Sequence, residues 1–361
     1  MNEITSLADL QFLVRTGETK WGQYGEVNAT YCDGMMLFNY SAVAQFANRW
    51  NFFERISRGL ILDAFSGEVI ARPFDKFHNW DVNHTNSTPI VDITEKLDGS
   101  LGILYRYKGE YRIATRGSFT SEQALWATRF LNHNYDLTGL DDDLTLLFEI
   151  IYPENRVVVD YDGWKALVLI AARSRSAGYE VTYNELGALA VRFGFDLVRR
   201  YQFFSVQDII DACHALSANN EGWVVRFADG ERLKFKGDAY RLAHRIMTGV
   251  TFNRVLEAVR DGLFEQMIEG VPDEFLAQIK AWKAEIDTAV EQVKQGVLSA
   301  LERAPQGAQK DFALWVQAEY SKDIQSYLFA AKAGKDITPL IYRKAFENRP
   351  NANVAQKEND A

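Results

Sequence analysis

The chain has 361 residues, of which 47% are hydrophobic, so it can bury a full core, and its length favours two domains over one. The formal net charge of -9 excludes a protein that coats nucleic acid through bulk positive charge. Any polyanion must therefore be bound by a local basic site.

Cysteine and histidine usage excludes further classes. Cys32 and Cys213 lie far apart without CxxC spacing, so neither a disulfide framework nor a zinc site is indicated. The five histidines lack HxxxH and HExxH spacing, which weighs against a histidine-based metal hydrolase. The first residues, MNEITSLADL, lack the basic start and apolar run of a signal peptide, and no apolar stretch has the length of a membrane span. We expect a cytoplasmic protein without membrane contact.

Short apolar or alternating runs, separated by Gly, Asp-Gly or Asn, fill the chain from about residue 20 to 240. Phe, Tyr, Val and Ile dominate these runs, and YKGEY and FADGERL have the composition of hairpin turns. The pattern predicts mainly antiparallel sheet. Two helices are expected among the strands: 121–134, which opens with Ser before Glu, and 183–194, which ends on a Gly suited to a helix C-terminus.

After about residue 240 the pattern is typical of helices. An apolar side chain recurs every three or four positions, at Trp282, Ile286, Val290, Val293, Val297 and Leu301. Residues 311–334 show the same periodicity, and 340–346 predict a further helix. The fold class is therefore α+β: an N-terminal domain of antiparallel sheets with flanking helices, then an all-α domain. The expected bounds are 1–243 and 244–346, with 347–361 as a disordered tail that has no apolar face to bury.

Lys96, in 94-TEKLDGSLGILYRY-107, stands just before an Asp-Gly turn and is the first candidate functional residue. The chain has neither GxxxxGK[ST] nor GxGxxG between a strand and a helix, so a bound nucleotide must be held by lysines and carboxylates on sheets. Because a free lysine is uncharged only about once in a few thousand molecules at pH 7, a nucleophilic Lys96 needs desolvation or nearby positive charge to lower its pKa. Lys234 and Lys236, two apart and hence on one face of a strand, are candidates for that charge and for a phosphate site.

Two acidic residues stand in strand contexts, Glu149 in LLFEIIY and Glu221 before GWVVRF. A buried carboxylate in an apolar strand normally has a cation or a metal as its partner. Mg²⁺ keeps several waters and takes only one or two carboxylates, which agrees with these sparse acids. Each segment alone also has an ordinary structural explanation, KLDGS as a hairpin turn and LKFK as the solvated face of an edge strand.

The order of the segments along the chain favours a functional interpretation. They are KLDG (Lys96–Gly99), RGS (Arg116–Ser118), FEI (Phe148–Ile150), EGWVV (Glu221–Val225) and KFK (Lys234–Lys236). This set resembles the covalent nucleotidyltransferase superfamily, which contains DNA ligases, RNA ligases and mRNA capping enzymes. FNYSA, RGLIL and RPFDKFHN upstream, with FTSEQAL and PENRVV between the motifs, are similar to phage ATP-dependent RNA ligases of the T4 RNA ligase 1 type. The resemblance covers roughly residues 20 to 245.

The resemblance implies an adenylyltransferase domain that joins 5′-phosphate and 3′-hydroxyl ends of single-stranded RNA, with cleaved tRNA as one substrate. Lys96 is the implied nucleophile, carrying AMP before an RNA-adenylate forms. The implied ATP-binding residues are Tyr40, Arg58, Lys76, Gly99, Arg116, Glu149, Glu221, Lys234, Lys236 and Tyr240. Glu149 and Glu221 are also expected to bind Mg²⁺, or Mn²⁺ in its place, through water. A monomer is expected, in the host cytosol if a phage encodes it.

Two departures and two alternatives accompany this interpretation. Arg116 stands where the family often has Lys, which keeps the charge but changes the donor geometry, and His78 replaces an aromatic residue in KFHN. A nick-sealing RNA or DNA ligase or a capping enzyme would use the same chemistry, but cellular DNA ligases and capping enzymes normally append an OB-fold where this chain predicts helix. A non-catalytic RNA end-binding protein is the other alternative, and the retained lysines and glutamates weigh against it.

Overall fold

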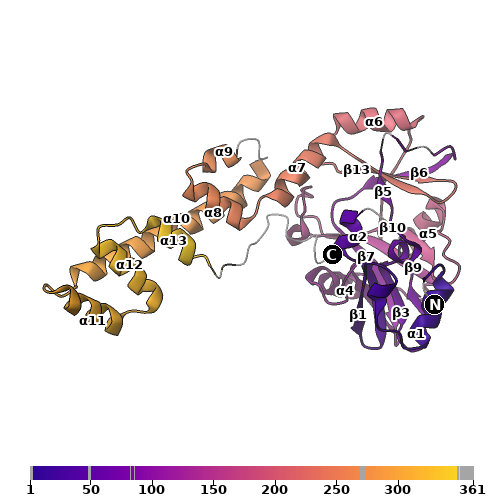
Figure 1. Cartoon of the computed structure of the whole chain (residues 1–361). Coiled ribbons are helices and arrows are strands. Elements are labelled where there is room, and N and C mark those ends of the chain that lie inside the picture. Colours follow the sequence, from indigo (N-terminus) through magenta and orange to yellow (C-terminus); the bar gives the residue numbers. More distant parts are fainter. Residues whose placement is uncertain are drawn as a thin grey trace. The chain divides into compact units, whose positions relative to one another are not determined.

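Figure 1 shows the computed structural model, which describes residues 3–47, 50–81, 83–84, 86–268, 273–347 and 349. The chain divides into two compact units, the first ending at Leu242 and the second beginning at Ala243. That these units act as the two predicted domains stays a prediction. The predicted disordered tail lies outside the described residues except for Glu347 and Arg349. None of the described helices has both the length and the apolar character required to cross a membrane.

The first sheet of the N-terminal unit has four antiparallel strands. In order across the sheet they are β1 (Val27–Cys32), β2 (Met35–Tyr40), β3 (Arg58–Asp63) and β4 (Val69–Ala71). The turn between β1 and β2 consists of Asp33 and Gly34, whose positive φ angles of 52° and 88° are those of a tight hairpin. The helical elements beside this sheet are α1 (Leu7–Arg15), η1 (Trp21–Gln23), α2 (Ala42–Ala47) and α3 (Phe52–Ile56). Tyr40 ends β2 where Arg58 begins β3.

The second sheet has five strands and forms the middle of the unit. Its order is β11 (Asp196–Leu197), β10 (Ala166–Ser174), β9 (Leu144–Ile151), β7 (Ser100–Tyr107) and β8 (Glu110–Ala114), and η2 (Pro153–Asn155) follows β9. Side chains on one face pack against helices α4 (Glu122–Asn134) and α5 (Tyr183–Phe193), and those on the other pack against the first sheet. Both predicted helices are confirmed. Ser121 accepts a hydrogen bond from the Ala124 backbone at the start of α4, and Gly194 ends α5 with φ 77°.

The third sheet carries most of the candidate residues. Its order is β12 (Arg200–Tyr201), β6 (Ile90–Lys96), β13 (Gly222–Phe227), β14 (Arg232–Lys236) and β5 (His78–Asn79). Helix α6 (Val206–Ala215) covers one face, where Cys213 packs in a core with Trp223 and Phe235 (Figure 1). Because side chains alternate along a strand, Lys234 and Lys236 lie on the opposite face, as the sequence predicts.

The C-terminal unit is helical, which confirms the predicted fold class. Helix α7 (Asp238–Gly249) begins in the first unit, and the helices that follow are α8 (Phe252–Arg260), α9 (Phe264–Ile268), α10 (Asp273–Glu302), α11 (Gln309–Glu319), α12 (Lys322–Lys332) and α13 (Thr338–Lys344). In α10, Trp282, Ile286, Val290 and Val297 of the predicted apolar face are buried. The prediction of one continuous helical pattern over 311–334 is wrong, because the chain leaves the helix at Tyr320 and starts α12 after Ser321.

Candidate functional site

Lys96 lies at the end of β6, next to Gly222 of β13, and Gly222 in turn lies next to Lys236 of β14. The carboxylate of Glu221 bridges the two lysines, with Oε2 2.7 Å from Lys96 Nζ and Oε1 2.9 Å from Lys236 Nζ. Only 2% of the Glu221 side chain is exposed. Gly222 has φ 139°, and a Cβ there would lie 1.9 Å from the carbonyl oxygen of Phe235. Glycine is therefore required for the strands to approach each other at this point.

The bridging carboxylate decides the protonation of Lys96. Burial disfavours the charged amine, but the carboxylates of Glu221 and Glu149 outweigh burial and hold the pKa of Lys96 above its ordinary value. Burial opposes ionisation of Glu221 too, yet its two lysines hold the pKa of that carboxyl below its usual range. The expectation that Lys236 and its neighbour would lower the pKa of Lys96 is therefore wrong for this structure, because the strand register places Glu221 between Lys96 and Lys236.

The pKa of Lys234 is lowered, in contrast to that of Lys96. Burial, followed by the positive charges of Arg58 and the other lysines at the site, puts the pKa of Lys234 well below its ordinary value. Its Nζ lies 4.7 Å from the centroid of the Phe77 ring, and Cζ of Arg58 lies 5.4 Å from the same centroid. Within the described ranges, Lys234 has no ion-pair partner. An anion is the group that would complete its surroundings.

A second group of cations surrounds the hydroxyl of Tyr40. Arg116 Nη1 donates to Tyr40 Oη at 2.9 Å, and Lys76 Nζ donates to it at 3.5 Å. Burial favours the neutral phenol, but Arg116, Arg58 and Lys76 outweigh burial and hold the pKa of Tyr40 below its ordinary value. In the part of the chain that the structure describes, none of these three cations has an ion-pair partner. We call Tyr40, Arg58, Lys76 and Arg116 the Tyr40 cluster.

The loop after Lys96 is fixed by the buried carboxyl of Asp98. Asp98 Oδ2 accepts hydrogen bonds from the backbone N–H groups of Val158 and Val159, both at 2.7 Å, and Oδ1 accepts one from the Tyr240 hydroxyl at 2.8 Å. The Asp98 N–H donates to Tyr161 Oη at 2.7 Å. The sequence prediction of ATP-binding residues omits Asp98 and Tyr161, although Asp98 stands inside the KLDG motif. A direct contact of Tyr240 with nucleotide stays a prediction.

Comparison with known proteins identifies the family. A family model described as RNA ligase matches residues 56–240, just over half of the chain. The chain belongs to the RNA ligase family. The matched range includes every predicted site residue except Tyr40. The resemblance stated from the order of the motifs is thereby confirmed at the level of the family.

Two curated relatives support this assignment. The chain is 29% identical over 263 residues to a protein of Autographa californica nuclear polyhedrosis virus, provisionally named a bifunctional polynucleotide kinase/RNA ligase; the match covers 65% of this chain and 36% of the relative. It is 27% identical over 215 residues to a provisionally named RNA ligase of Thermovibrio ammonificans, with 54% of each covered. The chain therefore spans only about a third and about half of the lengths of these relatives.

Solved structures give a weaker likeness. An archaeal ATP-dependent RNA ligase shares 17% identity with a TM-score of 0.47, over 75% of this chain and 77% of the other. At this level of similarity the match does not bear on the function of this chain.

Glu149 and Glu221 are two carboxylates beside Lys96, and their binding of a metal stays a prediction. Glu149 Oε1 accepts a hydrogen bond from the Gly99 N–H at 2.9 Å. Burial and then the charge of Glu221 raise the pKa of Glu149 to about 7, with Lys96 acting against them. The two carboxylates repel each other when both are ionised, and a divalent cation between carboxylate oxygens would remove that repulsion. The two residues therefore fit Mg²⁺ or Mn²⁺. No group of three metal-ligating side chains occurs among the residues that the structure describes.

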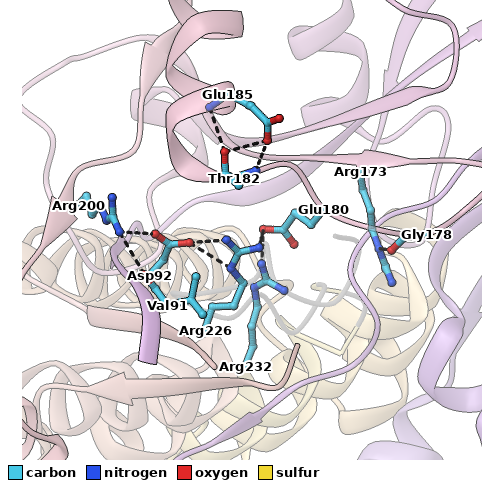
Figure 2. Close-up of polar contacts among 10 residues, drawn as sticks. All are labelled: Val91, Asp92, Arg173, Gly178, Glu180, Thr182, Glu185, Arg200, Arg226 and Arg232. Carbon is cyan, nitrogen blue, oxygen red and sulfur yellow. Dashed lines mark hydrogen bonds and ion pairs between the residues drawn. The ribbon is translucent and has the colours of Figure 1, made fainter. Parts of the chain in front are cut away.

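A separate charged network lies at the other end of the same strands and face (Figure 2). Arg226 contacts both Asp92 and Glu180, Arg200 Nη2 lies 2.9 Å from Asp92 Oδ1, and Arg232 contacts Glu180. Asp92 and Glu180 thus each have two arginine partners, with Arg226 shared between them, so both carboxylates are neutralised within the network. Its members tie β6, β12, β13 and β14 to the segment after β10. We assign it a structural role, since it anchors the strand that carries Lys234 and Lys236.

Proposed function

We propose that this protein is an ATP-dependent RNA ligase that joins 5′-phosphate and 3′-hydroxyl ends of single-stranded RNA. The observation that carries the proposal is the position of Lys96, which shares a buried carboxylate with Lys236 inside the range matched by the RNA ligase family. Family membership supports the reaction class, and the geometry supports the roles assigned below.

In the first step, the Lys96 amine attacks the α-phosphorus of ATP. The N–P bond forms as the bond from the α-phosphorus to the bridging oxygen of pyrophosphate breaks. Nζ must first lose a proton to solvent, because Glu221, whose Oε2 lies 2.7 Å away, raises the pKa of Lys96 and has its own pKa held below the usual range. Lys234 and Lys236 stand on the same face and supply positive charge to the α-phosphate as the charge on its oxygens is redistributed.

The remaining phosphates of ATP are assigned to the Tyr40 cluster. Its cations have no acidic partner among the described residues, so a polyphosphate can bind them without displacing a carboxylate. Glu149 and Glu221 are assigned to Mg²⁺ or Mn²⁺, which when bound would add positive charge beside the phosphates. Gly99 keeps the backbone close to this region, since a Cβ there would lie 2.5 Å from the carbonyl oxygen of Ile150.

The later steps use the same site. An oxygen of the RNA 5′-phosphate attacks the phosphorus of lysyl-AMP, the P–N bond breaks, and the Lys96 nitrogen regains its proton. The 3′-hydroxyl of a second RNA end then attacks the RNA phosphorus of this adenylate, AMP leaves, and a 3′,5′-phosphodiester forms. Each step is a displacement at phosphorus, for which positioning and charge stabilisation supply most of the catalysis.

Incorporation of label from α-labelled ATP tests the first step. With Mg²⁺ present, the wild type should gain one AMP in mass and Lys96→Ala none, because only the Lys96 amine is placed for attack. Lys165→Ala, which removes an exposed lysine of the same unit, is the matched control and should label normally. Equal labelling of wild type and Lys96→Ala, or an unlabelled wild type, contradicts the proposal.

The substrate class needs a separate experiment. We expect circularisation of a 5′-phosphorylated single-stranded RNA, and joining of a tRNA cleaved in its anticodon loop, to exceed sealing of a nicked duplex. Efficient sealing of the duplex alone would assign the protein to the nick-sealing ligases. Transfer of label to protein without joining of any RNA would favour the capping alternative, and absence of any labelling would favour the non-catalytic end-binding one.

A further inference from the structure

Trp50 contacts the Tyr40 cluster, although no motif in the sequence marks it. Its ring lies 4.9 Å from that of Tyr40 at an interplanar angle of 87°, and 5.8 Å from that of His78. Lys76 Nζ lies over both aromatic faces, 4.8 Å from the centroid of Trp50 and 5.0 Å from that of Tyr40. The ammonium group is therefore placed by two aromatic rings.

One short helix holds both Trp50 and Lys76. Trp50 directly precedes Asn51, which caps α3: Asn51 Oδ1 accepts from the Glu54 N–H, and Glu54 Oε2 accepts from the Asn51 N–H, both at 2.8 Å. The backbone N–H of Lys76 donates to the carbonyl oxygen of Arg55, on the same helix, at 2.8 Å. This shared anchor fixes the distance between the Trp50 ring and the Lys76 backbone.

An aromatic partner leaves the charge of Lys76 available. A carboxylate would neutralise the ammonium and would have to be displaced by an incoming phosphate. A cation over an aromatic face is stabilised by about 0.5–2 kcal/mol and keeps its full charge and its N–H donors. Burial lowers the pKa of Lys76 and so disfavours its protonated form. An aromatic neighbour stabilises the protonated amine without competing with phosphate for it.

We propose that Trp50 is a positioning residue that holds Lys76 for the terminal phosphates of ATP. The inference rests on the proposed function, because attack by Lys96 places the α-phosphate between Lys96, Lys234 and Lys236 and leaves the Tyr40 cluster for the phosphates beyond it. Trp50 then governs binding of ATP while contributing little to binding of AMP, which lacks those phosphates.

Nucleotide binding measured in the Lys96→Ala background tests the inference without any reaction. We expect Trp50→Leu to weaken ATP binding about tenfold, the loss of one partly desolvated cation–π contact, and to change AMP binding less than twofold. Trp50→Phe keeps an aromatic face and should weaken ATP binding less than threefold. Calorimetry with ATP and with AMP provides all four comparisons.

Trp126→Leu is the matched control for loss of a half-buried tryptophan. Trp126 stacks on Phe130 at 4.7 Å and on Tyr152 at 4.3 Å, with no cation in either contact. This variant should lower Tm while leaving the ratio of ATP to AMP affinity unchanged. Unchanged ATP affinity in Trp50→Leu, or equal loss of ATP and AMP affinity, overturns the positioning role. If Trp50→Leu does not fold, Trp50→Met, which also lacks an aromatic face but fills more of the space, takes its place, and wild-type ATP affinity in it would overturn the inference.

The wild type separates this inference from the proposed function. A wild type that takes no AMP from ATP overturns the ligase proposal and the Trp50 role with it. A wild type that labels normally, together with a Trp50→Leu variant whose KM for ATP is unchanged, overturns the Trp50 role alone.

Discussion

Two groups of cations lie on the N-terminal unit, and they are held in opposite ways. Lys96 and Lys236 share the buried carboxylate of Glu221. Lys76 and Arg116 lie against the ring and hydroxyl of Tyr40, and neither has an ion-pair partner among the described residues. A carboxylate neutralises charge and accepts protons, whereas an aromatic ring does neither.

The difference corresponds to different chemical tasks. A nucleophilic amine must lose a proton before it attacks phosphorus, so the carboxylate that keeps Lys96 protonated sets the pH at which the amine becomes reactive. Residues that hold a polyphosphate need permanent positive charge and never change protonation during the reaction. Substitution of Glu221 and Glu149, and then of Tyr40, tests whether the two groups of cations have these different tasks.

Glu221→Gln should have the largest effect. It leaves Lys96 and Lys236 close together without a counter-charge, and breaking a buried ion pair lowers the free energy of unfolding by about 3–5 kcal/mol. The pKa of Lys96 should fall, because the carboxylate is what holds it up against burial. The half-maximal pH of AMP transfer to Lys96 should therefore move to lower pH, measured by label incorporation from about pH 6 to 10.

The pH dependence of stability follows from the same two shifts. The carboxylates that raise the pKa of Lys96 stabilise the fold fully below about pH 10.4, the pKa of lysine in an unfolded chain. This stabilisation is lost as pH rises through the pKa of Lys96 in the folded protein. The lowered pKa of Glu221 stabilises the fold above the unfolded value of 4.5, and this is lost as pH falls through the folded pKa. The deficit of Glu221→Gln should thus be largest near neutral pH.

Glu180→Gln is the matched control. Glu180 is a partly buried acid that also has two cationic partners, Arg226 and Arg232, but it lies in the charged network of Figure 2. Its loss should lower the free energy of unfolding without moving the pH profile of AMP transfer. If the pH profile of AMP transfer did not move in Glu221→Gln, or moved equally in both variants, Glu221 and Glu180 would not differ in their effect on Lys96.

Glu149→Gln should stabilise the protein near pH 8 and have no effect near pH 4. Burial raises the pKa of Glu149 from 4.5 to about 7, so ionising it costs folding free energy that grows from about pH 4.5 to about pH 7. At about 1.4 kcal/mol per pKa unit the bound is about 3 kcal/mol, and partial exposure reduces it to about 1–2 kcal/mol. The glutamine carbonyl can still accept from the Gly99 N–H. Denaturant unfolding at both pH values measures the difference.

Adding metal sharpens the Glu149 test. If Glu149 binds Mg²⁺, saturating Mg²⁺ should stabilise the wild type more than Glu149→Gln at pH 8, since the cation removes the cost of the charged carboxylate. A variant that is less stable than the wild type at pH 8 without metal would show that the charged carboxylate already stabilises the fold, contrary to the assigned pKa.

The parts of the fold set by local sequence were predictable. Two-residue alternation places Lys234 and Lys236 on one face, and single residues at helix ends, Ser121 and Gly194, mark α4 and α5. The same periodicity hides the break between α11 and α12. Val316 and Tyr327 are both buried and eleven residues apart, so the apolar stripe continues across Tyr320 and Ser321 although the helix does not.

The parts set by register and by backbone donors were not predictable. Asp98 is fixed by N–H groups of Val158 and Val159, and any residue except proline supplies such a donor. The pKa of Lys96 depends on Glu221 standing beside it on another strand, more than a hundred residues along the chain, which spacing within a motif does not reveal. Trp50 has no neighbour in sequence that indicates its contact with Lys76.

Tyr40→Phe should have the smallest effect. It removes the oxygen that accepts from Arg116 at 2.9 Å and from Lys76 at 3.5 Å but keeps the ring that faces both. A protein hydrogen bond contributes about 0.5–1.5 kcal/mol net, so KM for ATP should rise about three- to tenfold with kcat nearly unchanged. Steady-state AMP transfer measures both constants.

Tyr161→Phe is the matched hydroxyl deletion on the other side of the comparison. Tyr161 Oη accepts from the Asp98 N–H at 2.7 Å and so holds the loop that carries Lys96. Its loss should lower kcat more than it raises KM for ATP, because it disturbs the nucleophile and leaves the phosphate-binding cations in place. If Tyr40→Phe and Tyr161→Phe both raised KM for ATP without lowering kcat, the group around Lys96 and the Tyr40 cluster would act as one site. The assignment of different tasks to the two groups would then be wrong.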